Sequence, residues 1–95
     1  MSKREEYVTK MKAQLDEWNE DIDKLEVKLS DASASTREKL APYLSEAREK
    51  RDAVTRKLRE LKDAGESSWD SMQAEVEHVW KAFKHSVNYF KSQLR

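Results

Sequence analysis

The chain has no cysteine, and it has only one glycine and one proline among its 95 residues. Without cysteine it can form no disulfide and offers no thiolate as a metal ligand or nucleophile. The scarcity of glycine and proline excludes most hairpin-rich β folds, because such folds need turn residues about every 8–12 positions. These absences favour a helical fold.

Long apolar runs and an excess of charge of one sign are also lacking. No stretch approaches the roughly 18 apolar residues of a membrane span, and no apolar run follows residues 1–6, so we expect neither a membrane span nor a signal peptide. Nineteen basic residues balance nineteen acidic ones, whereas nucleic-acid-binding proteins usually carry a basic excess. We therefore expect a cytoplasmic protein with no nucleic-acid partner.

The composition favours long helices in a single domain. Charged residues make up 40% of the chain and apolar residues 37%, which is too lean for a thick globular core. Such a composition is typical of coiled coils and long helices, and the length allows one domain, residues 1–95. The predicted fold class is all-α.

The first third of the chain carries apolar residues at alternating spacings of three and four. This is the a/d pattern by which helices interlock in coiled coils. We call these residues the seam and expect them to mediate self-association: Val8, Met11, Leu15, Trp18, Ile22, Leu25 and Leu29.

The stretch Ser30–Thr36 can be read in two ways. It is rich in serine, whose side chain competes with helical backbone hydrogen bonds, and Ser35 with Glu38 could form a capping box that opens a second helix. Alternatively, the a/d alternation continues through this stretch to Leu40 with one stutter, which a coiled coil can absorb. Pro42 should kink the helix in either case.

A helix end and a final amphipathic helix follow. Lys62–Gly65 combines a cation with a glycine terminator, and Ser67 or Ser68 could cap a helix over about 67–94. The apolar face of this helix is wider than an a/d seam, which indicates burial. We call it the C-terminal stripe: Trp69, Met72, Val76, Val79, Trp80, Phe83, Val87, Phe90 and Leu94.

Residues 2–26, with 50–61 and Trp69, resemble small coiled-coil proteins of proteobacteria and cyanobacteria that are labelled stress-response or uncharacterised. The resemblance implies a stress-associated role and no catalytic residues. It also implies an unbroken helix through residues 30–45, a pattern from which the serine-rich stretch and Pro42 depart.

We therefore predict a long helix over about 3–63, with a possible break or kink at 31–42 and the C-terminal helix folded back antiparallel. The exposed part of the seam would then be buried by dimerisation. The alternative is a three-helix bundle with turns near 31–36 and 64–67.

Two polar patterns are candidates for binding sites. Glu75 and His78 have the spacing that lets two side chains share a metal, but such pairs are common in acidic helices, so we expect no metal or cofactor. A basic stripe on the second helix is expected to pair with acids of the first helix rather than with nucleic acid; it comprises Arg48, Arg51, Arg59 and Lys62.

The predicted function is that of a non-enzymatic helical interaction protein, a homodimer or other homo-oligomer that uses the seam and the C-terminal stripe. An unidentified helical partner protein is a second way to cover those surfaces. The alternative function is binding to a lipid surface, because residues 81–95 combine four cations with Phe83, Tyr89 and Phe90 and carry no acid.

Overall fold

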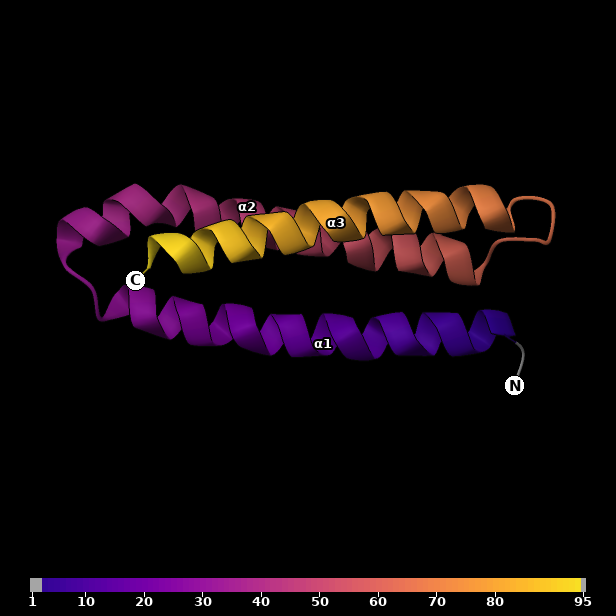
Figure 1. The fold of residues 1–95 in the computed structure, drawn as a ribbon, viewed down its shortest axis with the longest axis horizontal. Coiled ribbons are helices and arrows are strands. Elements are labelled where there is room, and N and C mark those ends of the chain that lie inside the picture. Colours follow the sequence, from indigo (N-terminus) through magenta and orange to yellow (C-terminus); the bar gives the residue numbers. More distant parts are fainter. Residues whose placement is uncertain (1–2, 95) are drawn as a thin grey trace.

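Three helices form the structure, a computed structural model that describes residues 3–94. Helix α1 spans Lys3–Ser30, α2 spans Ala34–Lys62 and α3 spans Trp69–Gln93. They lie side by side as rods, with each helix antiparallel to the one before it (Figure 1). The all-α class and the folded-back C-terminal helix are confirmed.

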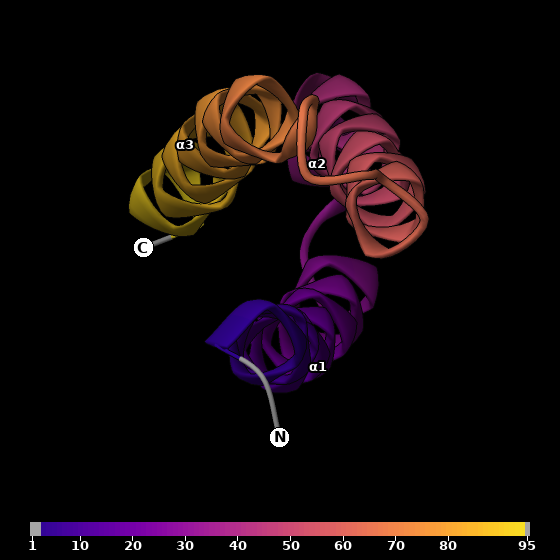
Figure 2. The same cartoon turned by 90° about the vertical axis from the view of Figure 1, so that its right-hand side faces the viewer.

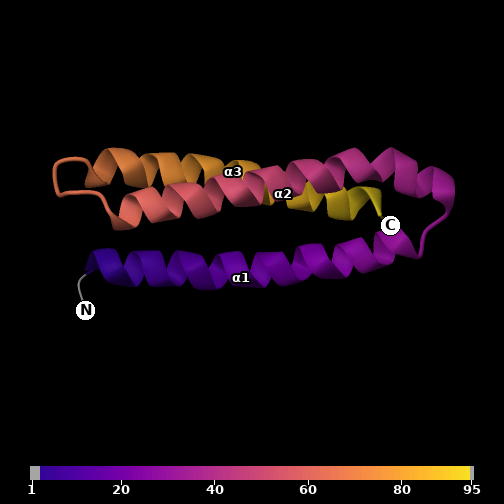
Figure 3. The ribbon, with the colours of Figure 1, turned by 180° about the vertical axis from the view of Figure 1, so that it is seen from behind.

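The bundle is elongated, with extents of 51 × 21 × 17 Å. Helices α2 and α3 pack most closely, and α1 packs less extensively on α2. Viewed end on, α1 stands apart from the α2–α3 pair (Figure 2). The rear view shows α1 running the full length of that pair (Figure 3). The three helices share one apolar core.

The long helix predicted over about 3–63 is broken at residues 31–33, within the range 31–42 given for a break or kink, and the three-helix alternative is confirmed. Helix α1 ends after Ser30 because polar side chains make hydrogen bonds with backbone groups that a continuing helix would pair with one another. Ser30 Oγ donates to the carbonyl of Val27 at 2.8 Å, and Ser33 Oγ accepts from the amide of Thr36 at 3.3 Å. Arg37 closes the turn by donating to the carbonyl of Ser30 at 3.1 Å.

Several predicted helix ends need correction in detail. The N-cap of α2 is Ser33, two residues before the predicted Ser35. Ser68 is the N-cap residue of α3, but its side chain makes no capping hydrogen bond. Gly65 follows α2 as predicted, yet no glycine among the described residues has a positive φ, so it does not act as a left-handed terminator.

Pro42 lies inside α2 without ending it. Its ring removes the N–H that would bond the carbonyl of Glu38, four residues earlier. Because Pro42 and Glu38 are both exposed, water can satisfy that carbonyl. The proline is therefore tolerated on the outer side of the helix.

We predict that Ser33→Ala lowers the free energy of unfolding by about 1 kcal/mol, the usual effect of removing a serine N-cap. Ser35→Ala is the matched control, because Ser35 is exposed and does not cap the helix. Urea denaturation followed by circular dichroism measures both. Equal losses in the two variants would contradict the assignment of the cap to Ser33.

Candidate functional site

The seam is covered within the chain itself. Trp18 is half-buried and packs against the core, and the other six seam residues are 8% exposed or less: Val8, Met11, Leu15, Ile22, Leu25 and Leu29. The expected dimer rested on an exposed seam. That reason no longer holds for the closed bundle, because α2 and α3 take the place of the partner.

The C-terminal stripe faces the same core. Five of its residues are buried: Val76, Trp80, Phe83, Val87 and Phe90. The remaining four are partly buried and pack against the core: Trp69, Met72, Val79 and Leu94. The stripe is therefore not free to enter a lipid surface while the bundle is closed.

Aromatic rings connect α1 to α3. The Trp18 ring centroid lies 6.2 Å from that of Trp80 and 5.8 Å from that of Phe83. Nearer the N-terminus, Tyr7 meets Trp69 edge-on at 6.2 Å. Such edge-on pairs contribute stabilisation beyond that of burying the area of the rings. The heptad pattern did not identify Tyr7, because it lies one position before the seam.

Ion pairs join the helices along their exposed edges. Arg48 of α2 pairs with Glu26 of α1, as the sequence predicts for the basic stripe. Lys91 of α3 pairs with Asp21 of α1 at 3.5 Å, and its Nζ lies 5.7 Å from the Trp18 ring centroid. Exposed pairs of this kind each contribute little stability, about 0–1 kcal/mol.

Glu75 and His78 lie on the part of α3 that faces α2. Glu75 lies 3.8 Å from the ammonium group of Lys57, on α2. Between residues 3 and 94, no group of three or more His, Asp or Glu side chains could hold a metal ion. His78 instead lines a shallow, largely apolar hollow between α2 and α3, with Val79 and Ala74.

A second hollow between α2 and α3 contains Glu46, His85 and Ser86, beside the Tyr43–Tyr89 ring pair. These are residue types of hydrolytic sites, in which hydrogen bonds must link nucleophile, base and acid. Within residues 3–94, no hydrogen bond joins Glu46, His85 and Ser86.

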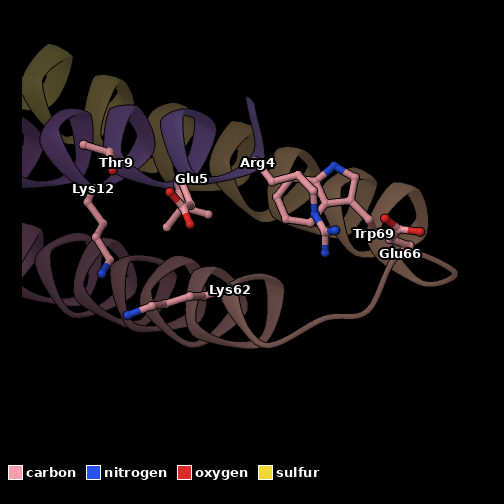
Figure 4. Close-up of a pocket in the computed structure, with 8 residues that line it drawn as sticks. Arg4, Glu5, Thr9, Lys12, Lys62, Glu66 and Trp69 are labelled. Atoms are coloured by element: carbon pink, nitrogen blue, oxygen red, sulfur yellow. The ribbon is translucent and has the colours of Figure 1, made fainter. Parts of the chain in front are cut away.

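A cavity of about 520 Å³ lies where the start of α1 meets the end of α2 and the start of α3. Figure 4 shows its polar side chains. The residues that line it are Arg4, Glu5, Val8, Thr9, Lys12, Lys62, Glu66 and Trp69. Sequence reasoning missed this cavity, because its residues are distant in the chain and share no motif.

Arg4 fixes one end of the cavity. Its guanidinium carbon lies 4.8 Å from the Trp69 ring centroid, and Nη2 donates to the carbonyl of Ala64 at 2.8 Å. This carbonyl lies just beyond α2, so Arg4 links α1 to both other helices. The cation–π contact adds roughly 0.5–2 kcal/mol.

A smaller groove of about 200 Å³ continues from the cavity between α1 and α2. It shares Lys12 and Lys62 with the cavity and adds Leu15, Thr55, Leu58 and Arg59. Half of the basic stripe therefore lies here, beside a lysine of α1, rather than against acids.

Comparison with protein-family models, with curated proteins and with solved structures found no match. The resemblance to bacterial coiled-coil stress proteins, and the stress role it implies, therefore stay predictions. No helix within residues 3–94 is both long and apolar enough to cross a membrane.

The Tyr7 hydroxyl gives a test of the α1–α3 contact. Burial raises the pKa of Tyr7 above its usual 10.0, and the negative charge of Glu77 on α3 raises this pKa further. The folded protein thus holds the proton more tightly than the unfolded chain. This contribution to stability is complete below pH 10 and is lost as the pH rises through the folded-state pKa.

We predict that the unfolding free energy of the wild type falls more steeply above about pH 10 than that of Tyr7→Phe. The comparison removes the contribution of every group that the two proteins share. Urea denaturation at each pH measures the difference. Parallel pH profiles would show that Tyr7 is not buried against α3.

Proposed function

We propose that the chain is a non-enzymatic helical interaction protein that self-associates by exchanging α1 between two copies. The observation that carries the proposal is that the seam and the C-terminal stripe meet in one core within a single chain. Association through these same surfaces requires the α1 of one copy to pack on the α2–α3 pair of another.

Helix α1 is the element best suited to exchange. The α2–α3 pair packs more closely than α1 packs on either helix. Domain exchange re-forms the contacts of the closed bundle between copies, so the two forms differ mainly in the connecting segment. The aromatic contacts of Trp18 and the Arg48–Glu26 pair would be kept in the exchanged form.

The connecting segment is short and can become helical. Residues 31–33 separate α1 from α2, and none of the described residues other than glycine has a positive φ. The a/d alternation continues across this segment. A continuous helix over residues 3–62 would be about 90 Å long at 1.5 Å per residue. Short connections of this kind favour exchange.

Lipid binding through α3 is less favoured by the geometry. Trp80, Phe83 and Phe90 would have to leave the core to reach a membrane, and α3 would have to separate from its closest neighbour. The exposed face of α3 carries Lys81 and Lys84, and Tyr89 is the exposed large hydrophobic residue of the described part of this helix.

Crosslinking tests the exchange. The chain has no cysteine, so a Glu26→Cys/Arg48→Cys variant can be joined only at those sites by a short bis-maleimide. In the closed bundle this link lies within one chain, whereas in the exchanged dimer it connects two. We expect the covalent dimer fraction to rise with protein concentration.

The matched control is Lys57→Cys/Glu75→Cys, which joins α2 to α3 within one chain in both forms. Its covalent dimer fraction should stay constant. Insertion of two glycines after Ala32 should relieve the short connection and lower the dimer fraction of the α1–α2 pair. Purely intramolecular links at every concentration, or equal dimer fractions for both pairs, would overturn the proposal. Flotation with liposomes would support the lipid alternative.

A further inference from the structure

The groove between α1 and α2 holds cations that have no acidic partner. Within residues 3–94, Lys12, Arg59 and Lys62 take part in no salt bridge. Three cations at other helix contacts are each paired with a carboxylate of the neighbouring helix: Arg48 with Glu26, Lys57 with Glu75, and Lys91 with Asp21. The cavity and the adjoining groove together are lined by four cations and two carboxylates, Glu5 and Glu66, which leaves a formal excess of two positive charges.

These cations form a row. The cavity and the adjoining groove share Lys12 and Lys62, and Figure 4 shows both side chains in the space between α1 and α2. Arg4 lies at one end, and Arg59 lies about one helical turn from Lys62. Arg4 and Lys12 are eight residues apart on α1, a rise of about 12 Å.

Hydrogen-bonding groups accompany the row. Thr9 lines the cavity, and Thr55 lines the groove, where its hydroxyl donates to the carbonyl of Arg51 at 3.0 Å. The Thr9 hydroxyl is therefore the threonine donor that lies among the cations. Glu5 and Glu66 are the carboxylates of the cavity lining. Figure 4 shows Glu5 between Arg4 and Lys12, and Glu66 beside Trp69 at the end away from Lys12. We call Arg4, Thr9, Lys12, Thr55, Arg59 and Lys62 the basic groove.

We propose that the basic groove binds a short, linear polyvalent anion, a small molecule with two or more phosphate or carboxylate groups. Lysine ammonium groups and arginine guanidinium groups are strong donors to both kinds of anion. The smaller groove is lined by three of these cations, Lys12, Arg59 and Lys62, and its lining includes no carboxylate. Two or three linked anionic groups can therefore each contact a cation there.

The charge around the basic groove limits the length of the ligand. Asp16, Glu17 and Glu20 follow Lys12 on α1 and are exposed. A long polyanion that extended past the groove along α1 would meet these carboxylates, and like charges at close range repel. The ligand is therefore a short anion rather than a nucleic-acid strand, in agreement with the zero net charge of the chain.

Binding here is independent of α1 exchange. Because exchange re-forms the α1–α2 contacts between copies, the basic groove exists in both forms. Its test can therefore fail or succeed without deciding the proposed function.

Calorimetric titration tests the proposal with two probes, tripolyphosphate and tricarballylate, at constant ionic strength. We expect saturable binding of at least one probe, and the stronger of the two identifies the anion class. Lys12→Met/Lys62→Met should weaken binding by about tenfold or more, because two charge-assisted contacts are lost.

The control Lys81→Met/Lys84→Met removes the same charge from exposed positions of α3. It should change the affinity less than about twofold, because salt screens the interaction between exposed charges that are far apart. Circular dichroism verifies that each variant is folded. Arg59→Gln, which alters one groove cation, should give a smaller loss than the double variant. Absence of binding by both probes, or equal weakening in the two double variants, would overturn the proposal.

Discussion

The contact of Trp18 with Trp80 and Phe83 determines how the seam is covered. Helices α2 and α3 pack closely, whereas α1 stands further from α3, and only large rings can fill that wider space. These rings lie near the middle of α1 and α3, and Tyr7 with Trp69 adds a second contact towards one end. Without them, α1 would lose its aromatic contacts with α3 and would keep polar ones such as the Lys91–Asp21 pair, so one side of the seam would face water.

Much of the fold follows from local periodicity. The three- and four-residue spacings correctly identified the buried face of α1 and the stripe of α3, because helix geometry alone decides which residues share a face. The break at residues 31–33 could not be decided in this way. A serine cap contributes only about 1 kcal/mol, so burial of the seam by α2 and α3 decides between a turn and a continuous helix, and this burial depends on contacts between distant segments.

The candidate surfaces also divide into features that the sequence reveals and features that depend on how the helices pack. The heptad pattern identified the seam, but this pattern does not indicate whether the helices that cover the seam belong to one chain or to two. The basic stripe of α2 was visible in the sequence, and its pairing with α1 is confirmed at Arg48. That Arg59 and Lys62 would instead face Lys12 depends on the side-by-side position of α1 and α2, which no spacing along the chain reveals.

The central claim is that the seam closes on its own chain through Trp18 and opens only by exchange. Small-angle X-ray scattering of the monomeric fraction, separated by size immediately before exposure, tests this most directly. The account predicts a particle whose longest dimension is close to the 51 Å of the closed bundle. A monomer about 90 Å long, the length of a continuous helix over residues 3–62, would contradict it.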